Sequence, residues 1–343
     1  MAIAAIGLLY AIGLPSSERV AAAANETLTA VPGIKVGHYT MTLRPTGCTV
    51  VLVEAGATAG VVVHGAAPAT RDTDLLRPEK MVQQIHGVAL SGGSLFGLSS
   101  VDGVLHFLDE QKIGIAYGGM RIPVVSGASI FDLGVGDAAV RPGSDCGYFA
   151  ARAASDAPVA EGSVGAGAGA TVGKLAGMGR AMKGGIGTAA VSMPDGLIVA
   201  ALVAANPLGD VIDPNTGKVV AGVRTADGHA LADARVLVRS GASTASGGNN
   251  STIGVIATNA RLTKDQATYL AQAGDDGYAR AIWPIHTEVD GDTVFALATG
   301  TKSGDVDMIR LGALAADVMA SALVRAVTQA TGLPGLPAVR ELR

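Results

Sequence analysis

The chain has 343 residues, of which 49% are hydrophobic and 16% are charged, and its net charge is −4 at pH 7. The charged share lies below the roughly 25% of an average globular protein, which indicates that most of the chain is buried in a large core. Lys and Arg residues are scattered along the sequence, so the basic patch of a nucleic-acid-binding protein is excluded.

The first thirty residues contain an apolar run, IAAIGLLYAIGL, followed by four alanines at 21–24. The run has the length of a signal-peptide core, and it is shorter than the roughly 20 residues of a membrane-spanning helix. A positively charged segment before the run is missing. We therefore expect residues 1–30 to be a signal peptide or a disordered start. The protein is then exported or periplasmic in the first case and cytoplasmic in the second, with no stable membrane span.

From Gly33 onwards, short β-branched runs alternate with helical patterns. TVVLVEAG and AGVVVHG predict strands, and a helix is predicted from about Ser94 to the end of SSVDGVLHFLDEQ. A second helix is predicted over DCGYFAARAA, with Ser144 as its N-cap. GTAAVSM and GLIVAALVAAN predict two buried strands joined by a Pro-Asp-Gly turn at 194–196, which indicates a hairpin.

The two cysteines lie in different predicted elements. Cys48 belongs to an apolar strand pattern and Cys146 to the second predicted helix. Their spacing matches neither a metal-binding motif nor a CxxC redox motif. The simplest expectation is two separate buried thiols.

Periodicity is lost over residues 224–250, which end in a tract rich in Ser, Gly and Asn. This composition is typical of an exposed, flexible connection. Structure resumes with the strand pattern STIGVIAT, followed by a helix with Thr263 as N-cap and Gln266 at the spacing of a capping box. VDGDTVFALATG predicts a turn into a strand, and residues 305–331 predict a long buried helix.

The junction of this tract with the strand, Gly247-Gly248-Asn249-Asn250-Ser251, has the features that self-cleavage requires. The hydroxyl of Ser251 can attack the Asn250 carbonyl, and the glycines let the backbone adopt the strained geometry of that attack. After cleavage the free α-amine, with a pKa of roughly 7.7–8.0, can accept the hydroxyl proton. By itself the tract also fits an ordinary surface loop before a strand.

A pair of carboxylates, Asp290 and Asp292, flanks a glycine before the last predicted strand. Two carboxylates at this spacing can face one site and hold an amine or a hydroxyl. The alternatives are a hairpin turn, which Asp-Gly favours, and a calcium site, although the twelve-residue loop of an EF-hand is absent.

Motifs for phosphate, metal and classical serine-hydrolase chemistry are missing. The tract GSVGAGAGATVGK departs from the phosphate-loop pattern at Ala168 and Leu175, which leaves Lys174 as a lone cation in an apolar stretch. Neither GxSxG nor HExxH occurs, and the six histidines show no ligand spacing. His286 is the histidine nearest in sequence to the carboxylate pair. We therefore expect no metal and no cofactor.

Eight tracts together resemble the DmpA-like aminopeptidases and amidases, a family that includes the nylon-oligomer hydrolases, and the pattern is closest to the nylon-oligomer branch. The resemblance covers nearly the whole chain after residue 30. The tracts are GIKVGHYT, TGCTVVL, APATRDTDLL, LSGGSLFGL, SGASIFDL, AANPLGDVID, NNSTIGVIATNA and IHTEVDGDTVFALATG.

The resemblance implies a role for each matching residue. Ser251 matches the nucleophile that self-cleavage places at a new N-terminus. Asp290 and Asp292 match the pair that orients its amine and hydroxyl. Asn206 matches an asparagine near the oxyanion site, where an amide N–H stabilises developing charge, and Lys174 matches a lysine at the same site.

One position departs from the family pattern. Phe131, in SGASIFDL, stands where the aminopeptidase and nylon-oligomer members have tyrosine. A phenylalanine side chain cannot donate a hydrogen bond. We therefore assign Phe131 to the substrate pocket and not to catalysis.

The resemblance also implies an α/β (α+β) fold, a four-layer αββα sandwich formed by residues 31–343 as one domain. It implies self-cleavage into an α chain, 31–250, and a β chain, 251–343, and a homo-oligomer that is a tetramer of αβ units. The implied activity is hydrolysis of a small peptide or amide. The alternatives are a self-processed acyl transferase of the ornithine acetyltransferase type, and a binding or assembly protein without catalysis.

Overall fold

The structure, a computed structural model, describes residues 25–242 and 250–342. The expected signal peptide, apart from its last six residues, lies outside the described residues. So does the end of the Ser/Gly/Asn tract, 243–249.

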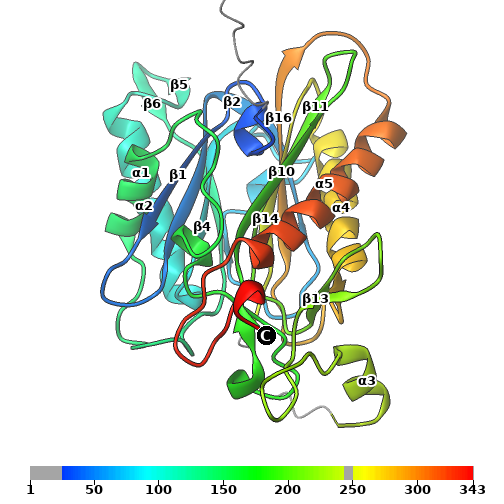
Figure 1. Cartoon of the computed structure of the whole chain (residues 1–343). Helices are drawn as coiled ribbons and strands as arrows, with labels where there is room; N and C mark the ends of the chain where they lie inside the picture. Colours follow the sequence, from blue (N-terminus) through cyan, green and yellow to red (C-terminus); the bar gives the residue numbers. More distant parts are fainter. Residues whose placement is uncertain (1–24, 243–249, 343) are drawn as a thin grey trace, which may run out of the picture.

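Two β-sheets lie face to face between two pairs of α-helices (Figure 1). One outer layer contains α1 (Ser100–Glu110) and α2 (Ser144–Arg152). The other contains α4 (Lys264–Ala281) and α5 (Met308–Thr328), which pack against each other. The expected four-layer αββα sandwich is confirmed.

The two sheets share one long strand, β2 (Gly47–Val63). Its first part pairs with β1 (Lys35–Thr40) and β4 (Ile85–Ser91), and its last part pairs with β16 (Thr293–Lys302). The hydrogen-bonded order is β10-β11-β14-β16-β2-β4-β7-β3. The other strands of this path are β3 (Thr70–Arg71), β7 (Val125–Ser129), β10 (Gly185–Ser192), β11 (Ile198–Ala205) and β14 (Ile253–Ala260).

Smaller elements surround these layers. The short strands are β5 (Ile115–Tyr117), β6 (Met120–Ile122), β8 (Thr171–Val172), β9 (Met182–Lys183), β12 (Asp210–Ile212), β13 (Val219–Ala221) and β15 (Ile282–Trp283). The remaining helices are α3 (Ala234–Arg239) and the 3₁₀ turns Leu28–Ala30, Asp74–Leu76, Ser94–Ser99, Gly165–Gly167, Met178–Arg180 and Val339–Glu341.

The apolar core fills the spaces between the layers, and β14 shows why its sequence is apolar throughout. Ile253 and Val255 face the cluster between the two sheets. Ile256 and Ala260 face the cluster that α4 and α5 cover. Successive side chains of a strand point to opposite faces, so a strand buried on both faces needs a continuous apolar run.

Several predicted elements are confirmed. The hairpin consists of β10 and β11, paired antiparallel. The capping box at the start of α4 is formed, with the Thr263 hydroxyl accepting from the Gln266 N–H and the Gln266 side chain accepting in return. The long C-terminal helix is α5. By length and composition α5 could cross a membrane, but it packs on α4, β10 and β11 as a core helix does.

Three local predictions are wrong. The helix expected from Ser94 begins as a 3₁₀ turn and becomes α-helical only at Ser100. The N-cap of α2 is Gly143 rather than Ser144, which is the first helical residue and makes no capping hydrogen bond. The stretch without periodicity contains α3, whose N-cap Asp233 accepts a hydrogen bond from the Arg235 N–H. In the first two cases the sequence indicated a helix but did not fix where it starts, and in the third it indicated no helix.

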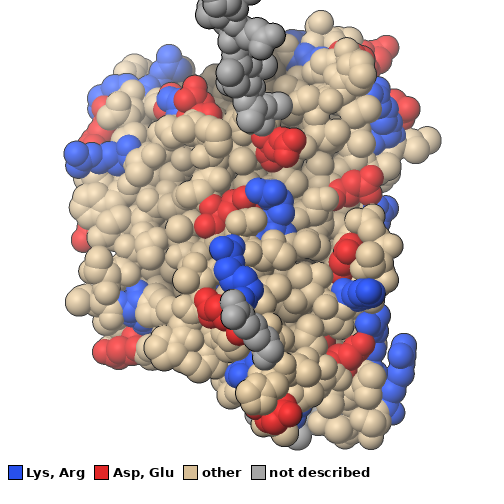
Figure 2. Space-filling view, in the orientation of Figure 1, with Lys and Arg blue, Asp and Glu red and all other residues tan. Residues whose placement is uncertain are grey.

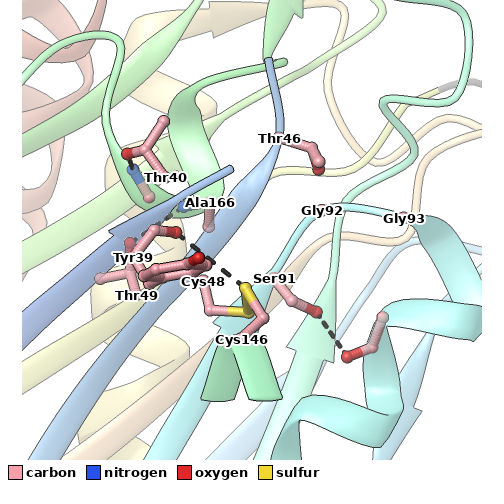
Figure 3. The surroundings of a disulfide bond; sticks show 12 residues. Tyr39, Thr40, Thr46, Cys48, Thr49, Ser91, Gly92, Gly93, Cys146 and Ala166 are labelled. Carbon is pink, nitrogen blue, oxygen red and sulfur yellow. Dashed lines mark hydrogen bonds between the residues drawn. A yellow bond between two sulfur atoms is a disulfide. The ribbon is translucent and has the colours of Figure 1, made fainter. Parts of the chain in front are cut away.

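The expectation of two separate thiols is also wrong, because Cys48 and Cys146 form a disulfide. Their Cα atoms are 5.8 Å apart across the interface of β2 and α2 (Figure 3). The Cys146 sulfur also lies 4.0 Å from the Tyr39 carbonyl oxygen. A separation of 98 residues gave no indication of this proximity. The packing of α2 against the sheet creates it.

Reduction of the Cys48–Cys146 bond should lower the free energy of unfolding by roughly 2–4 kcal/mol, because the bond closes a long loop in the unfolded chain. Denaturant unfolding with and without dithiothreitol measures the difference. The double variant Cys48→Ser/Cys146→Ser should be insensitive to the reductant. Equal stabilities of the wild-type protein in both conditions contradict this prediction.

On the face shown in Figure 2, basic and acidic side chains are interspersed rather than segregated.

Candidate active site

Parallel pairing of two strands brings the main sequence-predicted residues together. In the register of β14 and β16, Ile253 lies opposite Thr293. Parallel strands begin at the same edge of a sheet, so the residues just before each strand meet there. The segments around Ser251 and Asp292 therefore become neighbours, and two hydrogen bonds, Gly291 to Ser251 and Thr252 to Asp292, each join residues 40 positions apart.

Ser251 is buried, with only 4% of its surface exposed, and is not the surface-loop residue that the sequence suggested. Its Oγ accepts a hydrogen bond from the Gly291 N–H at 3.1 Å. A Cβ atom at position 291 would lie 2.7 Å from this Oγ, so only glycine fits there. Ser251 also has φ of +112°, a conformation that costs free energy for a residue with a side chain. The strain lies at the expected cleavage point.

The carbonyl of Asn250 is held by a backbone donor. The Phe131 N–H donates to the Asn250 oxygen at 3.2 Å. The Asn250 side-chain amide donates to the Val289 carbonyl at 3.1 Å. The bond that joins Asn250 to Ser251 thus has a hydroxyl beside it and an N–H group on its carbonyl oxygen. Phe131 contributes through its peptide group, which the side-chain comparison could not reveal.

Asn206 and Lys174 hold the backbone of Phe131, Asn206 directly and Lys174 through Asn206. The Asn206 Nδ2 donates to the Phe131 carbonyl at 3.2 Å, so its amide holds the Phe131 peptide rather than the Asn250 oxygen. The Lys174 ammonium donates to the Asn206 backbone oxygen at 3.0 Å and to its Oδ1 at 3.1 Å. Burial lowers the pKa of Lys174 to about 7, although Asp290 and Asp292 act in the opposite direction.

The lowered pKa of Lys174 should make the free energy of unfolding of the uncut Ser251→Ala variant depend on pH. An unfolded lysine has a pKa of roughly 10.4, so between about pH 7 and that value the unfolded chain binds more protons. The free energy of unfolding should therefore rise as the pH increases over this range. Adding Lys174→Met should reduce the rise. Lys183, whose pKa burial also lowers to about 7, acts in the same direction as Lys174, and His286, whose pKa is raised to about 10, acts in the opposite direction.

Denaturant unfolding at several pH values measures this effect. Lys218→Met changes an exposed lysine and should leave the rise unchanged. A rise that is the same with Lys174→Met would contradict the prediction.

The carboxylate pair precedes β16 and is not part of a hairpin, because β16 pairs with β14 and β2. Asp290 accepts from the Leu208 N–H at 3.2 Å and from the Thr287 hydroxyl. Burial, and then the nearby charge of Asp292, raise the pKa of Asp290 to about 6. Asp292 is fully buried and accepts from the Thr252 N–H at 2.7 Å, one residue beyond Ser251.

His286 also belongs to this region, although the spacing of the histidines in the sequence matched no metal-binding motif. Its backbone N–H and its Nδ1 both lie 3.1 Å from Asp292 Oδ2, and its Nε2 lies 3.2 Å from Asp275 Oδ2. Burial lowers the pKa of His286, but the hydrogen bonds with Asp275 and Asp292 outweigh it and raise the pKa to about 10. In the sequence, only the short distance between His286 and Asp292 indicated that His286 belongs to the site.

This arrangement suits acyl transfer. A hydroxyl lies beside a carbonyl whose oxygen already accepts a backbone hydrogen bond, and such a donor stabilises the negative charge that develops during attack. The buried lysine and the two carboxylates interact electrostatically with one another in the same region.

Comparisons with known proteins agree with this chemistry. Residues 26–339 match the model of peptidase family S58. An uncharacterised aminopeptidase of Mycobacterium leprae (strain TN) is 39% identical, over 92% of this chain and 94% of its own length. The 6-aminohexanoate-oligomer endohydrolase of Paenarthrobacter ureafaciens is 30% identical, over 86% of this chain and 84% of its own.

A solved structure supports the fold. The L-aminopeptidase D-Ala-esterase/amidase of Ochrobactrum anthropi, described as a variant of the Ntn hydrolase fold, aligns with a TM-score of 0.66 at 19% identity, over 92% of this chain and 90% of its own. The resemblance found in the sequence is thereby confirmed. The chain belongs to peptidase family S58 and is a hydrolase of peptide or amide bonds.

Proposed function

We propose that the chain cuts its own Asn250–Ser251 bond, and that the newly N-terminal Ser251 then hydrolyses short peptides and amides. The observation that supports this most directly is the hydrogen bond from the Phe131 N–H to the Asn250 carbonyl, beside a buried Ser251 hydroxyl. Intact mass under denaturing conditions tests it. We expect a C-terminal fragment that begins at Ser251, and a single uncut chain in freshly purified active protein would contradict the proposal.

The proposed self-cleavage takes two steps. The Ser251 Oγ attacks the Asn250 carbonyl carbon and loses its proton, while the Phe131 N–H stabilises the oxyanion. The C–N bond breaks, its nitrogen gains a proton, and Asn250 becomes esterified to Ser251. Water then hydrolyses the ester, which leaves an Asn250 carboxylate and restores the hydroxyl. Relief of the strained Ser251 backbone favours the first step.

Substrate hydrolysis reuses the same groups. The free α-amine of Ser251 accepts the hydroxyl proton, and Asp290 and Asp292 orient the amine and the hydroxyl from the start of β16. The substrate carbonyl takes the place that the Asn250 carbonyl held, so its oxygen faces the Phe131 N–H. Attack gives an acyl-enzyme on Ser251, the substrate amine leaves with a proton, and water releases the acid.

The side chain of Phe131 should have little influence on self-cleavage. Phe131→Tyr and Phe131→Leu both keep the peptide N–H, so each should change the cleavage rate by less than about tenfold, or ~1.4 kcal/mol of barrier. A time course of precursor loss on denaturing gels measures the rate. A change of about 10²-fold or more, the usual effect of losing an oxyanion donor, would show that the side chain supplies the donor instead.

The substrate class follows from the relatives named above. One is called an aminopeptidase and another an endohydrolase of 6-aminohexanoate oligomers, so we propose short peptides and linear amides as substrates. A panel of L-peptides, D-amino-acid amides, β-peptides and ω-amino-acid oligomers ranks the classes. Addition of free amines during the reaction distinguishes hydrolysis from acyl transfer, since a transferase would form a new amide.

A further inference from the structure

Two imidazoles and one carboxylate meet near the end of β2. Asp292 links this cluster to the Ser251 region, because its Oδ1 accepts from the Thr252 N–H and its Oδ2 lies 3.1 Å from His286 Nδ1. His64 follows the last residue of β2, Asp275 lies within α4, and His286 follows β15. One ligand atom from each of these three residues lies within 4.8 Å of the other two. His64 Nδ1 is 2.5 Å and His286 Nε2 is 3.2 Å from the same oxygen, Asp275 Oδ2.

The carboxylate of Asp275 is buried without complete hydrogen bonding. Only 3% of the residue is exposed. Among the described residues, its Oδ1 has no hydrogen-bond partner. A buried carboxylate oxygen without a partner is costly, and a bound cation is one way to offset that cost.

His286 has the hydrogen-bonding pattern of a metal ligand. One ring nitrogen, Nε2, faces the Asp275 cluster, and the other, Nδ1, faces the carboxylate of Asp292 at 3.1 Å. Histidines that bind metals usually donate their second ring N–H to a carboxylate, which fixes the tautomer and the orientation of the ring. Asp292 occupies that position here.

The donor set and the access both suit a zinc-type cation. Two imidazole nitrogens and one carboxylate oxygen form a common three-residue zinc set, in which water takes the fourth position. Ligand atoms around tetrahedral zinc lie about 3.3 Å apart, so the cluster needs only small movements to close. The His64 side chain is 53% exposed, so it can move and leaves a path from solvent.

We propose that His64, Asp275 and His286 form a binding site for a divalent transition metal, with Zn²⁺ as the expected ion. The cation takes the place of the imidazole protons that lie between His64, His286 and the Asp275 carboxylate. It lies outside the Ser251 centre and acts on it through His286, by fixing the ring that contacts Asp292. The proposal does not depend on Ser251 being the nucleophile.

Calorimetric titration of ZnCl₂ into untagged, chelator-treated and dialysed protein tests the site. We expect one Zn²⁺ per chain, and at least tenfold weaker binding in His64→Ala, by analogy with the roughly 10–100-fold losses seen when metal sites lose supporting groups. The matched control is His106→Ala. His106 pairs with Glu110 at 3.2 Å on the surface of α1, so it is the kind of pair that binds zinc adventitiously.

Thermal unfolding provides a second readout. Without metal, His64→Ala should unfold at a lower temperature than the wild-type protein, because it removes the His64 Nδ1 contact with the buried Asp275 carboxylate. Zn²⁺ should raise the unfolding temperature of the wild-type protein and of His106→Ala but not of His64→Ala. Absence of Zn²⁺ binding, equal affinity in His64→Ala, or loss of binding in His106→Ala each overturns the proposal.

Discussion

Ser251→Ala should leave the chain uncut and without hydrolytic activity. The substitution removes the only atom of that residue that can attack the Asn250 carbonyl, whereas the Phe131 N–H on the carbonyl oxygen remains. Intact mass should show one chain, and the rate of amide hydrolysis should fall to background. Loss of a nucleophile costs about 10⁶-fold in a serine hydrolase, so this is the largest effect that we expect.

Two further variants test whether the attacking hydroxyl belongs to residue 251 or to residue 252. Ser251→Thr keeps a hydroxyl and should still be cut, while Thr252→Val removes the neighbouring hydroxyl and should also be cut. Ser251→Ala leaves the buried Gly291 N–H without its acceptor, so it should also lower the free energy of unfolding by roughly 1–3 kcal/mol. Cleavage that persists in Ser251→Ala and stops in Thr252→Val would move the nucleophile to Thr252.

Asp292→Asn should slow both self-cleavage and hydrolysis by roughly 10²–10⁴-fold, the range for loss of a positioned acid–base group. Asp292 accepts hydrogen bonds from the Thr252 N–H and from the backbone and ring of His286. An asparagine has one acceptor oxygen and places its NH₂ group against one of these donors. The start of β14, and with it Ser251, then loses its fixed position.

A time course of precursor loss and the steady-state rate on the best substrate measure the effect of Asp292→Asn. Asp276→Asn makes the same chemical change on the exposed face of α4 and should cleave and hydrolyse as the wild-type protein does. If Asp292→Asn were cut at the wild-type rate, Asp292 would act only on substrate and not on the precursor.

Much of the local structure could be predicted from the sequence, because its causes are local. The β10–β11 hairpin follows from a Pro-Asp-Gly turn between two apolar runs, and the start of α4 follows from a Thr and a Gln three residues apart. Strands buried on both faces, such as β14, appear as continuous apolar runs. The start of α2 was misplaced because Ser144 is a capping residue type, which does not show whether its side chain makes the capping bond.

The residues of the site were named from the sequence, but their contacts were not. Every residue except proline carries a backbone N–H. The amino-acid sequence therefore does not show that the Phe131 N–H is the donor to the Asn250 carbonyl oxygen. The comparison of side chains drew attention to the missing tyrosine hydroxyl instead. Only the packing of the segment after β7 against Asn250 assigns the donor.

By itself, then, the sequence determined the family, because the resemblance depends on residue types and their spacing. Through that resemblance it predicted the layered fold and the roles of Ser251 and its carboxylate pair. Tertiary structure alone decided which distant residues meet. Parallel pairing of β14 with β16 brings Asp292 to Ser251, and the packing of α2 and α4 on the sheets brings Cys146 to Cys48 and Asp275 to His286. Such contacts depend on strand register and helix packing across long separations, which no local pattern encodes.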